Sequence, residues 1–230
     1  MDTVERLTRL GPDARAHVSV PKITGTGGMV LLRSHGNASS VEMEKEDVDE
    51  MAFRFAMPVV AWEYPGYGAD TRGTPSSASI CAAAEQAYDW TARAWPGATI
   101  VVMGRSIGTG PACHLARVRP IGALVLQSPF TTIADLAAEH VGWGTGYVCP
   151  AIYDNLAAVS EMRAPVLFIH GMRDTLIPRQ HSQRLFSAAQ KSRMRRAHYA
   201  PMADHNAWRQ EEDVWMPMDG FLRDMLRLPL

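Results

Sequence analysis

Short runs of branched apolar residues alternate along the chain with longer stretches in which apolar residues recur at helical spacing. Runs typical of buried strands lie at 28–36, 57–64, 98–104, 121–128 and 164–171, with a weaker one at 195–200. Stretches that predict helices lie at 41–56, 76–95, 108–118, 179–192 and 207–228, the last interrupted at Pro217. Because strands that alternate with helices form parallel sheets, we expect an α/β fold with helices on both faces of a mostly parallel sheet.

One segment, residues 133–163, does not follow this alternation. It is too short to form a second domain, so the pattern predicts a single domain over 1–230 with a small lid-like insertion. Glycines lie among aromatic residues in the segment, and we expect Trp143 and Tyr147 to bind substrate in a pocket under this lid. The alternative is that these aromatic side chains pack on the sheet as part of the core.

Charge and composition narrow the classes of partner. Of the 230 residues, 47% are hydrophobic and 20% are charged, and the formal net charge is -1. This is the profile of an ordinary soluble globular protein. A near-neutral chain has no electrostatic basis for nucleic acid or an anionic membrane as its main partner, and we interpret the basic run at 193–198 as a solvated end of an element.

The chain also lacks the usual signals for export or membrane insertion. It has no stretch of about 18 consecutive apolar residues, and its first residues have no apolar core of a signal peptide. Cys81, Cys113 and Cys149 are too few and too scattered for a disulfide framework or a metal site. We therefore expect a cytoplasmic protein without an integral membrane segment, and the sequence does not indicate its oligomeric state.

The strongest chemical signal is the sequence Gly-Arg-Ser-Ile-Gly at 104–108. It fits the pattern G-x-S-x-G and lies between a predicted strand and a predicted helix, which is the context that this motif requires. At such a tight turn the serine adopts a strained backbone conformation, and side chains two residues away on either side would collide. We therefore predict that Ser106 is a nucleophile. The plain alternative is an ordinary turn.

A serine nucleophile needs a base and an acid that orients the base. In G-x-S-x-G hydrolases these residues follow the serine in the order Asp and then His. Asp174 follows the strand at 164–171, and His205 follows the strand at 195–200, so both lie where loops at the carboxyl ends of parallel strands meet. We predict the triad Ser106, Asp174 and His205. Asp204 is too close in sequence to reach the histidine ring easily.

An oxyanion that forms at the serine needs hydrogen-bond donors. The backbone amide of Ile107 lies at the start of the helix that follows the serine, and the loop at 34–40 offers a second amide, which we assign to Asn37. His35 lies on the wrong loop to act as the base. We interpret it as a structural histidine that holds this loop by hydrogen bonds.

Longer segments extend the motif into a family resemblance. They are SHGNA, WEYPGYGADTRGTPS, GRSIGTGPACHLA, LVLQSPFTT, YDNLAAVSEMRAPVLFIHGMRDTLIP and ADHN. In this order, from about Val30 to His205, they resemble the α/β-hydrolase-domain proteins of the protein-depalmitoylase branch. The resemblance implies an α/β-hydrolase fold, the same triad and serine-hydrolase activity. Relatives of that branch include depalmitoylases and proteins grouped with serine peptidases of the prolyl oligopeptidase type.

The sequence departs from that family pattern in three places. Arg105 stands where relatives usually carry glutamine, and we expect it to be a surface residue paired with a carboxylate such as Glu63. The segment before Val30 is short, which predicts a trimmed edge of the sheet. The acylatable cysteine cluster near the N-terminus of membrane-targeted relatives is missing here.

These observations predict a serine hydrolase that cleaves acyl esters or thioesters of a small molecule or an acylated protein, without a cofactor or a metal. The proton transfers follow the Ser-His-Asp scheme through an acyl-enzyme. Two alternatives stay open from the sequence. One is a serine peptidase similar to the prolyl oligopeptidase group, and the other is a catalytically inactive hydrolase fold that serves as a binding protein.

Overall fold

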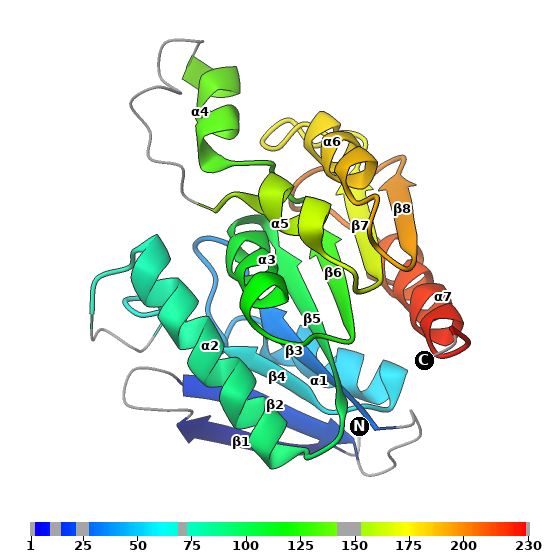
Figure 1. The fold of residues 1–230 in the computed structure, drawn as a ribbon. Helices are drawn as coiled ribbons and strands as arrows, with labels where there is room; N and C mark the ends of the chain where they lie inside the picture. Colours follow the sequence, from blue (N-terminus) through cyan, green and yellow to red (C-terminus); the bar gives the residue numbers. More distant parts are fainter. Residues whose placement is uncertain (1–2, 10–14, 22–27, 69–72, 142–152, 229–230) are drawn as a thin grey trace.

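The computed structural model describes residues 3–9, 15–21, 28–68, 73–141 and 153–228. Its centre is an eight-stranded sheet with the order β1-β2-β4-β3-β5-β6-β7-β8 (Figure 1). The strands are β1 (Thr3–Arg9), β2 (Arg15–Pro21), β3 (Met29–Ser34), β4 (Val59–Trp62), β5 (Thr99–Arg105), β6 (Ala123–Gln127), β7 (Val166–Gly171) and β8 (Arg195–Ala200). The strands from β3 to β8 pair in parallel, whereas β2 pairs antiparallel with both β1 and β4.

Helices cover both faces of the sheet (Figure 1). They are α1 (Lys45–Phe55), α2 (Ser77–Ala94), α3 (Thr109–Val118), α4 (Ile133–Val141), α5 (Asn155–Glu161), α6 (Gln180–Ala188) and α7 (Met216–Met225). Alternate strand residues point to opposite faces. In β3, Leu32 belongs to a buried cluster that includes residues of α2, α3, α5 and α6, whereas Leu31 belongs to a second cluster with residues of α1 and α7. The α/β-hydrolase arrangement predicted from the sequence is therefore present.

The N-terminal strands β1 and β2 were not expected from the hydrophobic pattern. In β2, apolar Ala16 and Val18 alternate with polar His17 and Ser19, and all four residues are buried, so neither face of the strand is a solvent face. The His17 ring lies 3.3 Å from the Asp49 carboxylate of α1. Residues 16–20 do alternate as in a strand, but this short segment lacks the continuous apolar run that marks the buried strands of the parallel sheet. The segment before Val30 thus adds two strands to an edge that the sequence predicted to be trimmed.

The last helical stretch differs in detail from its prediction. A π-helical segment spans Gln210–Trp215, and α7 follows it directly with Pro217 in its first turn. A proline is tolerated at that position because the amides of the first turn have no intrahelical partner. Pro217 therefore lies near the start of α7 rather than at an interruption. In the described part of the chain, no helix is long and apolar enough to cross a membrane.

Candidate active site

Ser106 lies at the sharp connection between β5 and α3. The strand ends at Arg105, and a single 3-10 turn over Ser106–Gly108 leads directly into the helix. The backbone of Ser106 has φ +53°, the strained left-handed conformation expected for this motif. Ser106 is only 8% exposed. The turn thus holds a hydroxyl at the carboxyl end of a central strand.

The two glycines of the motif let backbone segments approach closely. A Cβ on Gly104 would lie 2.3 Å from the carbonyl oxygen of Gly108. A Cβ on Gly108 would lie 2.4 Å from the carbonyl oxygen of His35, in the loop after β3. Both distances are far below van der Waals contact, and backbone atoms cannot move aside cheaply. The glycines therefore pack the turn against the neighbouring loop.

We expect Gly108→Ala to lower the free energy of unfolding by about 1–3 kcal/mol, because the new methyl group forces backbone atoms apart. Urea unfolding followed by circular dichroism measures this change. Gly220→Ala is the matched control, since nothing lies within 4 Å of a Cβ there and alanine favours the helix interior of α7. Equal effects of the two substitutions would contradict the steric explanation.

His205 and Asp174 meet Ser106 in a continuous line of hydrogen bonds. Ser106 Oγ lies 3.0 Å from His205 Nε2, and His205 Nδ1 lies 2.8 Å from Asp174 Oδ2. Asp174 lies in the turn after β7, and His205 lies in the loop after β8. The Asp174 side chain is fully buried, and that of His205 is 12% exposed. The structure thus brings together the three residues that the sequence singled out.

Hydrogen bonds keep the Asp174 carboxylate ionised. Burial by itself raises the pKa of Asp174, but hydrogen bonds from His205 and from the Ile177 amide, with the nearby histidines, outweigh burial and hold the pKa below its usual range. Asp174 Oδ1 accepts from the amides of Leu176 and Ile177 at 3.0 and 2.8 Å. An ionised carboxylate only accepts, so His205 Nδ1 carries the proton and Nε2 is left to accept from the Ser106 hydroxyl.

A second histidine, His170, lies behind the carboxylate and was not singled out in the sequence. Its Nε2 donates to the Ile177 carbonyl at 2.7 Å and lies 3.5 Å from Asp174 Oδ2. Its Nδ1 lies 2.6 Å from the Ser182 hydroxyl of α6. Burial lowers the pKa of His170, which favours the neutral ring. The only signal in the sequence is its position at the end of β7, four residues before Asp174.

Asp204 and His35 both have structural roles, and the role of His35 was predicted from the sequence. Asp204 Oδ1 accepts from the amides of Asn206 and Ala207, at 2.8 and 2.7 Å, so this carboxylate shapes the loop. His35 Nε2 lies 2.9 Å from Glu63, and its Nδ1 lies 2.8 Å from the carbonyl of Gly36. His35 thus holds the loop after β3 by hydrogen bonds, as predicted.

The loop that carries Asn37 lies against the serine. Ser34 and Gly104 pair in register in the parallel strands β3 and β5, so the loops that follow them are neighbours. A Cβ on Gly36 would lie 3.9 Å from the Cβ of Ser106. The Asn37 side chain accepts a hydrogen bond from the Tyr67 hydroxyl at 2.7 Å. These contacts bring the predicted oxyanion loop to the same end of the sheet as Ser106 and Ile107.

Arg105 does not pair with Glu63, contrary to the expectation from the sequence. Glu63 is occupied by His35 and by the amide of Val41. The Arg105 Nη2 atom instead donates to the backbone carbonyl of His205 and to the Asn206 side chain, both at 3.0 Å. Sequence alone cannot show this contact because its partners lie 100 and 101 residues further along the chain.

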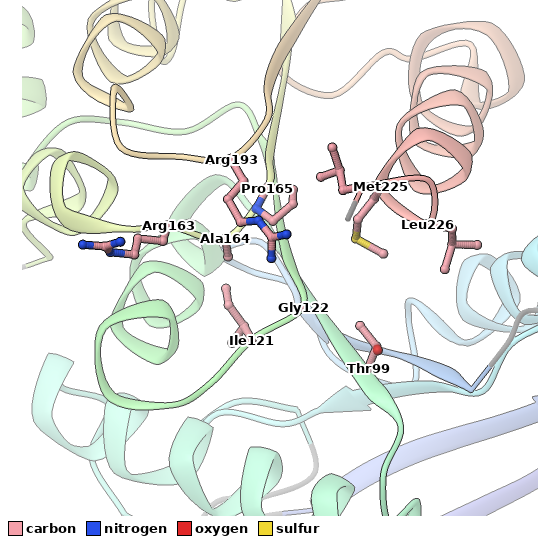
Figure 2. A pocket seen from close by; sticks show the side chains of 10 residues that line it. Thr99, Ile121, Gly122, Arg163, Ala164, Pro165, Arg193, Met225 and Leu226 are labelled. Atoms are coloured by element: carbon pink, nitrogen blue, oxygen red, sulfur yellow. The ribbon is translucent and has the colours of Figure 1, made fainter. Parts of the chain in front are cut away.

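A hollow lies at each end of the sheet, and the one beside His205 could hold a substrate. A groove of about 570 Å³ lies beside His205, between the loops after β7 and β8, and Arg173, Leu176 and Asn206 are among its lining residues. A pocket of about 440 Å³ lies at the opposite, amino ends of the strands, between the loops before β6 and β7 and the end of α7 (Figure 2). This second pocket is remote from the serine. Trp143 and Tyr147, the predicted substrate-binding residues, lie outside the described residues.

Comparisons with known proteins agree with the fold. No family model matches the chain. An uncharacterised protein of Mycobacterium tuberculosis is 33% identical over 172 residues, which cover 74% of this chain and 60% of that protein. The lysophosphatidylserine lipase ABHD12 of Danio rerio is 27% identical, with 87% and 58% covered, and the human α/β-hydrolase domain-containing protein 17B is 29% identical, with 80% and 64% covered.

Solved structures of similar fold include esterases and lipases. An esterase of Pyrococcus furiosus matches with a TM-score of 0.74 at 18% identity, covering 98% of this chain and 91% of that chain. A soluble variant of the monoglyceride lipase of Saccharomyces cerevisiae matches with a TM-score of 0.74 at 17% identity, with 98% and 96% covered. The chain spans about 60% of the length of the curated relatives named above. It has the α/β-hydrolase fold and is a homologue of the α/β-hydrolase domain-containing proteins.

Proposed function

We propose that the chain is a serine hydrolase that cleaves acyl esters or thioesters through Ser106, His205 and Asp174. The observation that carries the proposal is the unbroken line of hydrogen bonds from the Ser106 hydroxyl through the His205 ring to a buried, ionised Asp174. A base at 3.0 Å is within reach of the hydroxyl proton, and the acid fixes the base in the required tautomer.

The first half of the reaction acylates the enzyme. The Ser106 oxygen attacks the acyl carbonyl carbon while its proton passes to His205 Nε2, and the carbonyl oxygen becomes an oxyanion. The tetrahedral intermediate then collapses, the bond to the leaving alcohol or thiol breaks, and that group takes the proton from Nε2. Asp174 stabilises the imidazolium that exists between these two transfers.

The second half returns the enzyme to its resting state. A water molecule gives its proton to His205 Nε2 and attacks the acyl carbon, and collapse of the second intermediate releases the acid and returns the proton to Ser106. In both halves the amides of Asn37 and Ile107 would donate to the oxyanion. Fixed donors of this kind stabilise the transition state because they need no reorganisation during the reaction.

The relatives suggest the class of substrate. One curated relative is a lysophosphatidylserine lipase, and one structural neighbour is a monoglyceride lipase, so acyl esters of small molecules or lipids are the first candidates. Thioesters of acylated proteins are the second, because of the resemblance to the depalmitoylase branch. In either case we expect Trp143 and Tyr147 to contact the acyl group of the substrate. We expect the protein to act in the cytoplasm.

A fluorophosphonate probe and a small substrate panel test this proposal. The panel contains p-nitrophenyl esters and acyl thioesters of increasing chain length, together with short peptides. We expect covalent labelling of Ser106 and hydrolysis of esters or thioesters but not of peptides. Labelling together with peptide cleavage alone would indicate a peptidase. No labelling and no turnover would indicate an inactive hydrolase fold and would overturn the proposal.

A further inference from the structure

The last residue of β5, Arg105, and the first residue of the turn that follows it, Ser106, both contact His205. Ser106 meets the ring of His205 through Nε2, and Arg105 donates to its backbone carbonyl from Nη2, each at 3.0 Å. The Trp208 indole N–H donates to the same carbonyl at 3.1 Å. The residue proposed as the base is therefore held at its side chain and at its main chain by separate parts of the fold.

The loop that carries His205 needs such a restraint. It joins β8 to the π-helical segment at Gln210 and contains no helix or strand of its own. Strands β6 and β7 separate β8 from β5, so the sheet itself gives no direct contact between the base and the serine. A displacement of a catalytic group by about 1 Å can reduce the rate about 100-fold.

The guanidinium also lies against the oxyanion loop. A Cβ on Gly36 would lie 3.2 Å from Arg105 Nη1. The side chain of Arg105 thus lies between the loop after β3 and the loop after β8, directly beside the serine that both loops serve. A planar guanidinium with several fixed donors suits this bridging position better than a flexible ammonium group.

We infer that Arg105 is a positioning residue, which ties the His205 loop to the strand end that carries the nucleophile. The inference rests on the proposed function. Arg105 acts through His205 rather than on the substrate: it fixes the main chain from which the imidazole extends toward Ser106. Its removal therefore affects the rate of acyl transfer at saturating substrate more than the affinity for substrate.

Arg105→Met tests the inference because methionine fills a similar space but has no hydrogen-bond donor. We expect kcat for p-nitrophenyl acetate, per folded molecule, to fall about 10- to 100-fold with KM changed less than about 2-fold. The rate of labelling of Ser106 by a fluorophosphonate should fall in parallel. Arg105→Lys keeps the charge without the planar group, and its kcat should lie between those of Arg105→Met and the wild type.

Two further variants separate positioning from a general effect of charge or packing. Trp208→Phe keeps an aromatic side chain but removes the other donor to the His205 carbonyl. It should also lower kcat, but by less than Arg105→Met does. Arg209→Met removes an exposed cation of the same loop, one that pairs with Asp213, and it should leave kcat within about 2-fold of wild type.

The outcomes are distinguishable. If the wild type is active and Arg105→Met is equally active, this inference alone is overturned. It is also overturned if the substitution changes only KM, or if the folded fraction of the variant keeps full wild-type activity. Should Arg105→Met fail to fold, a wild-type kcat in Arg105→Lys and Trp208→Phe would overturn it in the same way. A wild type that neither labels nor hydrolyses esters would overturn the proposed function itself.

Discussion

Ser106→Ala is expected to lower kcat for ester hydrolysis by about 10⁴- to 10⁶-fold and to abolish fluorophosphonate labelling. The variant loses the attacking oxygen, and His205 then has no hydroxyl to activate. The fold should be retained, because alanine is smaller than serine and pays no more than serine does for φ +53°. Absorbance assays of p-nitrophenyl acetate hydrolysis measure the change in kcat, and in-gel fluorescence of the probe measures the loss of labelling.

Ser128 provides a matched control for this substitution. It is buried after β6, has φ +47° and shares the strained backbone of Ser106, but it has no hydrogen bond to a base among the described residues. We expect Ser128→Ala to keep wild-type labelling and turnover. Labelling that survives in Ser106→Ala, or that disappears equally in both variants, would mean that Ser106 is not the nucleophile.

Asp174→Asn is expected to lower kcat on the order of 10⁴-fold with little change in the fold. The asparagine oxygen can still accept from the amides of Leu176 and Ile177, which leaves the amide nitrogen facing His205. That nitrogen donates to His205 Nδ1, so the ring proton moves to Nε2. The ring then has no lone pair toward Ser106 and cannot remove its proton.

Asp204→Asn is the natural comparison, because it is an equally conservative change next to His205. The Asp204 side chain accepts from two loop amides through one oxygen, and an asparagine oxygen can do the same. We expect steady-state kcat to change by less than about 3-fold, since only a neutral amide replaces an exposed carboxylate. A larger loss in Asp204→Asn than in Asp174→Asn would show that the orienting acid had been misassigned.

The sequence predicted the parts of the fold that depend on apolar runs. The strands from β3 to β8 bury residues such as Leu31, Val102 and Phe168, whose runs stand out against polar flanks. The helices between these strands were predicted except α4 and α5, which lie in the segment 133–163 that the sequence predicted to be a lid-like insertion. The hairpin of β1 and β2 could not be found in this way, because its second strand is not an apolar run: polar His17 and Ser19 alternate with Ala16 and Val18. Its place in the sheet depends on pairing with β4, which is a tertiary contact.

The site could be predicted as far as local motifs and strand order reach. The turn at Ser106 has a local signature, and Asp174 and His205 follow strands whose ends meet in a parallel sheet. The partners of long polar side chains have no such signature. Arg105 reaches a carbonyl in the loop after β8 rather than Glu63, and His170 supports Asp174 from inside the core. Such contacts depend on side-chain direction, which spacing in the sequence does not determine.

The strand order has a consequence for local opening of the native state. β8 is one of the two edge strands and, among the strands that the structure describes, pairs only with β7, whereas β5 is enclosed by β3 and β6. Edge elements with half-exposed side chains open at lower free energy than a central strand does. Opening of β8 would move His205 away while Ser106 stays in its strained turn, so the molecule would lose its base in a sub-global fluctuation long before the sheet unfolds. The hydrogen bonds from Arg105 and Trp208 to His205 work against that fluctuation.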